Sequence, residues 1–118
     1  MPLDVSIIVP SYNSSHTLPT TLQALAVQTF PSDRFEVIVV DDCSTDDTQT
    51  IVERWESKVP FCLQYIQRPF NGGPGASRNS GLKVAQGEVI GFVDSDVEAA
   101  PNWIELDKGL LLPLCTEP

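Results

Sequence analysis

The sequence predicts an α/β domain with a mostly parallel sheet and helices on both faces. Segments with the composition of buried strands alternate with segments of helical periodicity, in the order β-α-β-α-β-α-β-α. Parallel strands need such intervening helices, which then cover the two faces of the sheet. Polar clusters also follow three of the predicted strands, and ligands bind at that edge of open parallel sheets.

The first half of the chain contains two predicted strand and helix pairs. Residues 5–9 are a β-branched run, typical of a strand covered on both faces, and residues 15–28 place apolar side chains at helical spacing. Residues 35–40 form the second predicted strand. Ser44, followed three residues later by Asp47, resembles a capping box and predicts the start of the second helix.

The second half begins with a third predicted strand over residues 61–66. A glycine-rich loop at residues 71–75 precedes a short predicted helix over residues 76–86. Gly87 follows at the point where a left-handed helix cap is expected. After a fourth strand, a last helix is predicted over residues 101–112.

The fourth strand is an apolar run that ends in two carboxylates, Asp94 and Asp96. Residues i and i+2 of an extended segment point to the same side and lie about 6.5–7 Å apart, so both carboxylates can face one small volume. Hard divalent cations are typically held by one or two carboxylates together with substrate phosphates. The segment therefore predicts a cation site, whereas the alternative is a solvated turn.

The polar side chains at the other strand ends favour a nucleotide as the ligand. Asp42 can accept a hydrogen bond from a ring N–H, Tyr12 offers a flat face for stacking, and Asn13 can donate or accept. Arg78 places a planar cation near the same edge. Two alternatives stay open at this point: Asn13 as filler at a strand end, and Arg78 in an ordinary surface ion pair.

Length, charge and cysteine content define the class of protein. The 118 residues are 42% hydrophobic, which is enough for a single domain over residues 1–118. The net charge is −9 and the seven Lys and Arg residues are scattered, which argues against nucleic acids as partners. An odd count of three cysteines favours a reducing cytoplasm. No apolar run is long enough to span a bilayer, so any membrane association would be peripheral, at the inner face.

Four motifs resemble those of the family 2 glycosyltransferases, in the same order and spacing. They are SIIVPSYN at residues 6–13, VVDDCSTD at 39–46, GASRNSG at 75–81 and FVDSD at 92–96. The resemblance covers roughly residues 3–105 and implies the Rossmann-like GT-A nucleotide-diphosphosugar transferase fold. It also implies an inverting transfer of a sugar from a UDP-, GDP- or dTDP-linked donor to an acceptor hydroxyl, with Mg²⁺ or Mn²⁺.

The resemblance assigns roles to individual residues. Pro10, Tyr12 and Asp42 would contact the nucleoside, with Arg78 nearby. Asp94 would lie by the ribose or the metal, and Asp96 would ligate the metal on the diphosphate. Asn13 completes the set of candidate nucleotide-binding residues through the hydrogen-bonding capacity of its amide.

The catalytic residue stays unknown, because the family's catalytic base belongs to an acceptor-binding half that is not found after Leu106. We therefore expect the donor-binding and metal-binding part of a glycosyltransferase, truncated before the acceptor half, with the acceptor unknown. A non-catalytic nucleotide-binding or interaction module is the alternative, and a plain structural domain is a third reading. The Leu-rich stretch at residues 110–115 predicts self-association.

Overall fold

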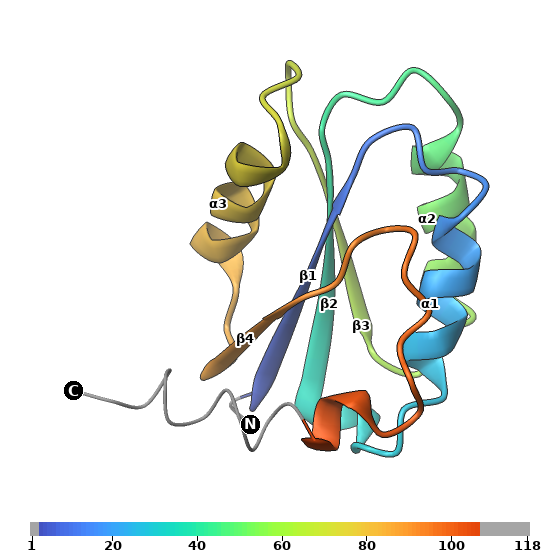
Figure 1. The fold of residues 1–118 in the computed structure, drawn as a ribbon, viewed down its shortest axis with the longest axis vertical. Helices are drawn as coiled ribbons and strands as arrows, with labels where there is room; N and C mark the ends of the chain where they lie inside the picture. Colours follow the sequence, from blue (N-terminus) through green and yellow to red (C-terminus); the bar gives the residue numbers. More distant parts are fainter. Residues whose placement is uncertain (1–2, 107–118) are drawn as a thin grey trace.

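The computed structural model describes residues 3–106, which form a four-stranded parallel sheet between two layers of helix (Figure 1). The strand order is β3-β2-β1-β4. The strands are β1 (Val5–Ser11), β2 (Phe35–Asp41), β3 (Cys62–Gln67) and β4 (Val89–Phe92). The helices are α1 (Leu18–Ala26), α2 (Thr48–Glu56) and α3 (Pro74–Val84), with a short 3₁₀ turn at Ser32–Arg34. The predicted fold class is confirmed.

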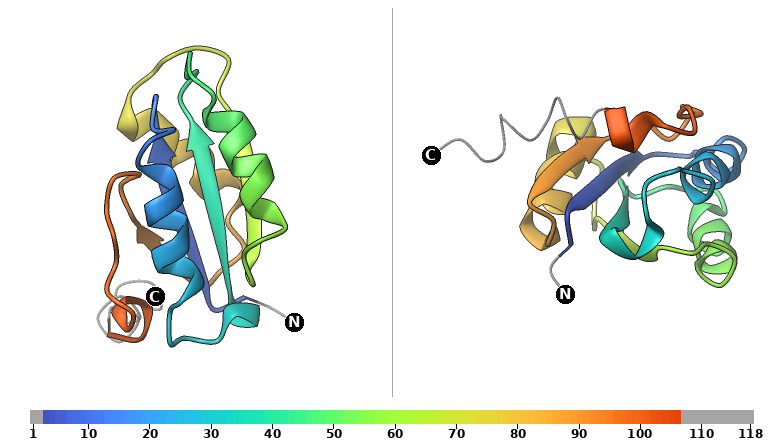
Figure 2. Two further views of the ribbon diagram at one scale, coloured as in Figure 1. Left: turned by 90° about the vertical axis from the view of Figure 1, so that its right-hand side faces the viewer. Right: turned by 90° about the horizontal axis from the view of Figure 1, so that it is seen from below.

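The two helical layers follow from the alternation of side chains along the central strands. Val5, Ile7 and Val9 of β1 point to the larger apolar cluster, where α1 and α2 lie side by side (Figure 2). Ile8 belongs to a smaller cluster with Ile38, on the face that α3 covers. β1 and β2 are buried on both faces, and most of their residues are accordingly apolar. The exceptions before the last residue of each strand are Ser6 and Glu36, whose side chains hydrogen-bond to each other at 2.6 Å.

The strand register brings the polar strand ends to one edge of the sheet. Ser11 pairs with Asp41 at the ends of β1 and β2, so the residues that follow both strands emerge together. β4 ends earlier, where Phe92 pairs with Ile8. The segment after β4 therefore begins beside Ile8, before the end of β1, and Ser95 in this segment lies 2.7 Å from Ser14 in the loop after β1, measured between the two Oγ atoms.

Several of the predicted helix boundaries are wrong. α1 and α3, predicted over residues 15–28 and 76–86, span residues 18–26 and 74–84. Ser44 does not cap α2, because its hydroxyl donates to the carboxylate of Asp41. The Asp46 carboxylate instead accepts from the backbone N–H of Thr48, at 3.1 Å, and the helix begins there. At the other end of the chain, residues 103–106 are helical and Pro101 lies in the turn before them. The remainder of the predicted last helix, and the Leu-rich stretch at residues 110–115, lie outside the described residues.

Gly87 does not form the predicted left-handed cap. α3 ends at Val84, and the glycine with a positive φ in the described part of the chain is Gly73, at 90°. A Cβ on Gly87 would lie 2.6 Å from the backbone nitrogen of Ser6. The chain needs a glycine here because a Cβ would not fit between the two backbone segments, and not because the position requires a positive φ.

Within residues 3–106, none of the helices is both long and apolar enough to cross a membrane.

Candidate functional site

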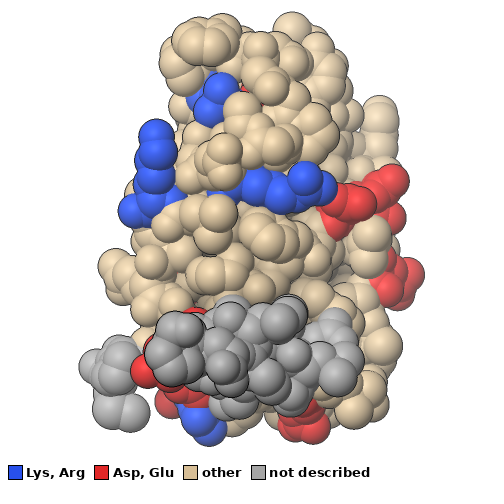
Figure 3. Space-filling view, turned by 60° about the vertical axis from the view of Figure 1, so that its left-hand side comes forward, with Lys and Arg blue, Asp and Glu red and all other residues tan. Residues whose placement is uncertain are grey.

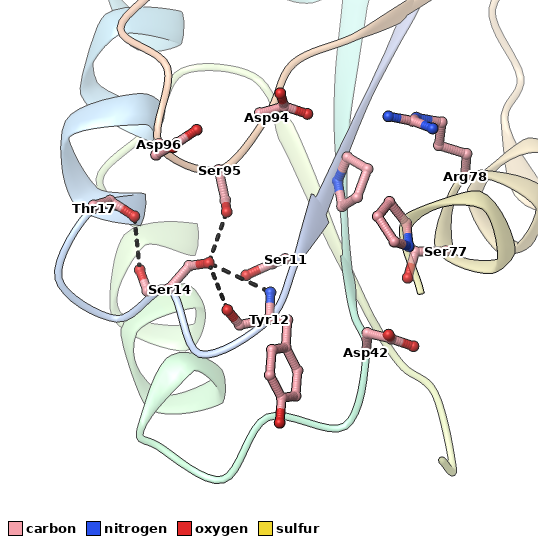
Figure 4. Close-up of a pocket in the computed structure, with 12 residues that line it drawn as sticks. Ser11, Tyr12, Ser14, Thr17, Asp42, Ser77, Arg78, Asp94, Ser95 and Asp96 are labelled. Carbon is pink, nitrogen blue, oxygen red and sulfur yellow. Dashed lines mark hydrogen bonds between the residues drawn. The ribbon is translucent and has the colours of Figure 1, made fainter. Parts of the chain in front are cut away.

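A cavity of about 580 Å³ opens at the edge of the sheet where β1 and β2 end (Figure 4). Its walls come from the ends of these strands, the loop before α1, the first turn of α3 and the segment after β4. The lining residues are Pro10, Ser11, Tyr12, Ser14, Thr17, Asp42, Pro74, Ser77, Arg78, Asp94, Ser95 and Asp96. The volume is within the range of about 300–1,000 Å³ that small-molecule sites occupy.

Six of the seven candidate site residues line this cavity, and Asn13 does not. The amide oxygen of Asn13 accepts hydrogen bonds from the backbone N–H groups of Thr45, at 2.8 Å, and Asp46, at 3.3 Å. Its backbone has a φ of 49°, a left-handed conformation that asparagine tolerates well. Asn13 therefore connects the loop after β1 to the loop after β2.

Asp42 lies at the end of β2 with only 4% of its surface exposed, and its carboxylate is already hydrogen-bonded. Oδ1 accepts from Nε of Arg68, at 3.0 Å, and from the backbone N–H of Gly72, at 2.9 Å. Oδ2 accepts from the backbone N–H of Gly73, at 2.8 Å. The side chain expected to meet a nucleobase thus holds the glycine-rich loop, with little acceptor capacity left for a ligand.

These contacts also determine the charge of Asp42. Burial on its own raises the pKa of this carboxyl, but the hydrogen bonds from Gly72 and Gly73 and the ion pair with Arg68 outweigh it. The pKa is held below its ordinary value of 3.8, so Asp42 is ionised at neutral pH.

Arg68 is not among the predicted site residues, although its position in the sequence carries a signal. Arg68 follows β3 directly, just as Asp42 follows β2, so the rule that selected the strand-end acids applied to it as well. Its guanidinium also donates to the hydroxyl of Ser80 in α3, at 2.7 Å. Arg68 therefore connects the ends of β2 and β3 to α3.

Asp94 and Asp96 line the same cavity, but the predicted extended geometry between them is wrong. β4 ends at Phe92, and the N–H of Val97 donates to the carbonyl of Asp94 at 3.1 Å, which closes a turn. We call residues 94–97 the acidic turn. Both carboxylates are exposed and have no hydrogen bond or ion pair within residues 3–106.

The acidic turn fits a hard divalent cation. Two free carboxylates beside an open cavity can supply one or two oxygen ligands, and magnesium-like ions take the rest from water and phosphate. Residues 3–106 contain no group of three or more acidic, histidine or cysteine side chains placed to hold a metal ion. This donor set suits a metal that arrives with a phosphate ligand.

Arg78 provides positive charge on the opposite wall. It extends from α3 toward Asp94 of the acidic turn (Figure 4). Its Cζ lies 5.8 Å from the ring centroid of Phe92. Among the described lining residues, Arg78 alone is cationic. Figure 3 shows several Lys and Arg side chains on this side of the molecule. The sequence of α3 includes Arg78 and Lys83. The cavity therefore combines acidic groups on one wall with a guanidinium on the other.

Two serine hydroxyls in the cavity walls are buried without a hydrogen-bond partner in the described part of the chain. Ser11, at the end of β1, is 3% exposed, and Ser77, in the first turn of α3, is 1% exposed. Neither Oγ has a hydrogen-bond partner among residues 3–106. A buried hydroxyl without a partner is costly, and such groups at a cavity wall are available to a ligand.

Comparison with known proteins gives the same picture of the chain. The profile of a family described as "Glycosyl transferase family 2" matches residues 6–106. TarS of Staphylococcus aureus, a poly(ribitol-phosphate) beta-N-acetylglucosaminyltransferase, is 50% identical over 91 residues. That match covers 77% of this chain and 16% of TarS.

Solved structures agree with these sequence matches. The structure of TarS residues 1–349 in complex with UDP has a TM-score of 0.84 and 44% identity, and covers 91% of this chain and 31% of that one. The mannosyltransferase PcManGT from Pyrobaculum calidifontis, in complex with GDP-Man and Mn²⁺, has a TM-score of 0.84 and 29% identity. It covers all of this chain and 35% of its own. The chain thus spans about a sixth of TarS and about a third of these solved chains.

Proposed function

Since the chain belongs to glycosyl transferase family 2, we propose that it is the donor-binding domain of a metal-dependent, inverting sugar transferase. In this proposal residues 1–118 bind a nucleoside-diphosphate sugar and its cation, and an acceptor hydroxyl attacks the sugar. The observation that carries the proposal is a pair of carboxylates, Asp94 and Asp96, that line a polar cavity at the edge of the sheet where ligands bind and that have no partner among residues 3–106.

The roles of the lining residues follow from their positions. Pro10 and Tyr12 form the wall at the end of β1, where a base can stack. Arg78 faces the acidic turn across the cavity, where it can contact a diphosphate oxygen. Asp94 and Asp96 would hold Mg²⁺ or Mn²⁺, which supplies positive charge against the charge that builds up on the leaving diphosphate.

Asp42 has an indirect role in this proposal, through the glycine-rich loop. Its carboxylate fixes the backbone of Gly72 and Gly73, and this loop leads directly into the first turn of α3. Ser77 and Arg78 both belong to that helix, so Asp42 helps to position these two side chains in the cavity wall. Asp42 therefore contributes to nucleotide binding through the loop that it holds, and through the acceptor capacity that remains on its carboxylate.

We propose UDP as the nucleotide, ahead of GDP and dTDP. The support is the structure of TarS with UDP, at 44% identity, against 29% for the neighbour that holds GDP-Man. The odd count of three cysteines supports action in a reducing compartment such as the cytoplasm.

The test is thermal unfolding of the chain with UDP, GDP or dTDP, each with and without Mn²⁺. A ligand at a hundred times its dissociation constant adds about 2.7 kcal/mol, which raises the Tm of a domain of this size by several degrees. We expect the largest metal-dependent rise with UDP. Asp96→Asn should abolish the metal-dependent part of the rise.

Glu98→Gln is the matched control, because Glu98 is an exposed carboxylate two residues away that lines a different surface depression. It should keep the full metal-dependent rise. No rise with any nucleotide in the unaltered chain would overturn the proposal. An equal loss in both variants would show that the acidic turn has no special role.

A further inference from the structure

The acidic turn is anchored to the protein by a buried threonine of α1. Thr21 is 1% exposed, and its Oγ1 lies 3.0 Å from the carbonyl oxygen of Ser95 and 2.7 Å from that of Val97. These two carbonyls belong to the residues on either side of Asp96. One hydroxyl, shared between both acceptors, therefore fixes the backbone before and after this carboxylate.

This use of a helical threonine is unusual, because the hydroxyl of a threonine within a helix commonly bonds to a carbonyl of the preceding turn. The backbone N–H of Thr21 does bond to the carbonyl of Thr17, at 3.3 Å. Its hydroxyl, in contrast, reaches residues 74 and 76 positions further along the chain. The side chain of Thr21 is thus committed to the acidic turn.

A second hydroxyl supports the same turn from the loop after β1. Oγ of Ser14 lies 2.7 Å from Oγ of Ser95, and it is also hydrogen-bonded to the backbone N–H and carbonyl of Tyr12, at 3.3 and 3.2 Å (Figure 4). The wall that carries Tyr12 and the turn that carries the carboxylates therefore share one polar contact. Thr21, in contrast to Ser14, holds the turn without lining the cavity.

We propose that Thr21 is a positioning residue that holds Asp94 and Asp96 in the geometry needed to bind one divalent cation. This inference rests on the proposed function of the site. Like charges on two nearby carboxylates repel each other until a cation arrives, and the turn has a single backbone hydrogen bond of its own, from Val97 to Asp94. Anchoring the backbone on both sides of Asp96 keeps the ligands in place before the metal binds.

Three variants separate this role from general packing. Thr21→Val removes the hydroxyl and nearly keeps the shape, Thr21→Ser keeps the hydroxyl, and Thr20→Val changes the exposed neighbour in the same helix. The first measurement is the Mn²⁺ concentration that gives half of the thermal stabilisation in saturating UDP. The second is the dissociation constant of UDP without metal, by titration calorimetry.

We expect Thr21→Val to raise the half-effective Mn²⁺ concentration by about 10–100-fold, the usual effect of removing a group that orients metal ligands. The affinity for metal-free UDP should stay within about twofold of the unaltered chain, since Thr21 does not line the cavity and its hydroxyl contacts only two backbone carbonyls, to which the proposed function gives no role in nucleotide binding. Thr21→Ser should recover most of the Mn²⁺ response, and Thr20→Val should match the unaltered chain. An unchanged Mn²⁺ response in Thr21→Val, or an equal loss of metal-free UDP binding, would overturn the proposal.

A metal-independent measurement separates this inference from the proposed function. Hydrogen exchange at the Val97 amide, whose N–H closes the acidic turn, should be at least tenfold faster in Thr21→Val, while amides of β1 and β2 keep their protection. Unchanged exchange at Val97 refutes the anchor whatever the chain binds. Faster exchange in a chain that binds neither UDP nor Mn²⁺ would keep the anchor but reject both the metal-binding purpose and the proposed function.

Discussion

Replacing Asp42 with asparagine tests whether its carboxylate holds the site together. The carboxylate accepts from three donors, which are Nε of Arg68 and the backbone N–H groups of Gly72 and Gly73. Asparagine keeps one acceptor oxygen and turns an NH₂ group toward donors that need acceptors. The change therefore removes about two hydrogen bonds and leaves a guanidinium without its counter-ion.

The magnitude follows from the burial of the pair. Hydrogen bonds to charged groups contribute about 1.5–3 kcal/mol each, and removing one partner of a buried ion pair costs about 3–5 kcal/mol. The side chain of Arg68 is 16% exposed, so water compensates part of the loss. We expect Asp42→Asn to lower the free energy of unfolding by about 3 kcal/mol. In a domain of this size that is a fall in Tm of roughly 12 °C or more.

Chemical denaturation at pH 7 and at lower pH measures this effect and its sign. The pKa of Asp42 is lowered in the folded state, so its stabilising contribution is complete above the unfolded value of 3.8 and is lost as the pH falls through the folded value. The gap between the unaltered chain and Asp42→Asn should therefore narrow below pH 3.8. Asp47→Asn, at an exposed carboxylate without a capping hydrogen bond, is the control and should change little. A gap under about 1 kcal/mol at pH 7 would refute the reasoning.

Two further predictions concern single side-chain atoms. Ser77→Ala removes a buried hydroxyl that has no partner in the described part of the chain. The change should raise the free energy of unfolding by about 1 kcal/mol and weaken UDP binding. A clear loss of stability in urea denaturation would contradict this prediction. Gly87→Ala should cost at least about 1–3 kcal/mol, because its Cβ would lie 2.6 Å from the backbone of Val5 and Ser6. Gly75→Ala is the control, because Gly75 lies in a helix and has open space where the methyl would be added. This change should stabilise the chain by about 0.5–1 kcal/mol. Equal effects of the two glycine changes on the Tm would argue against the close contact at Gly87.

The sequence alone determined the fold class and the edge of the sheet that carries the site. Apolar runs and helical periodicity are local signals, and the order in which they alternate leaves few parallel topologies. Because parallel strands end at a common edge, polar residues directly after a strand could be assigned to one site. Tyr12, Asp42, Asp94 and Asp96, which follow three different strands, do line a single cavity.

The tertiary structure decided which atoms those side chains meet. A glycine at position 87 is expected both for a left-handed helix cap and for a close contact between two backbones, so the sequence does not distinguish these two reasons. The position of β1 shows that the close contact is the reason. The sequence does not show which groups the Asp42 carboxylate contacts, and in the folded chain one of them is Arg68, 26 residues away.

Thr21 is the clearest case of a role that no local pattern predicts. In the sequence it is an ordinary threonine within a helix, and its hydroxyl could bond to the preceding turn. The carbonyls that it holds lie more than 70 residues further along the chain. Periodicity specifies which face of a helix is buried, but the partner of a buried hydroxyl depends on how distant segments pack, so only the folded chain could assign it.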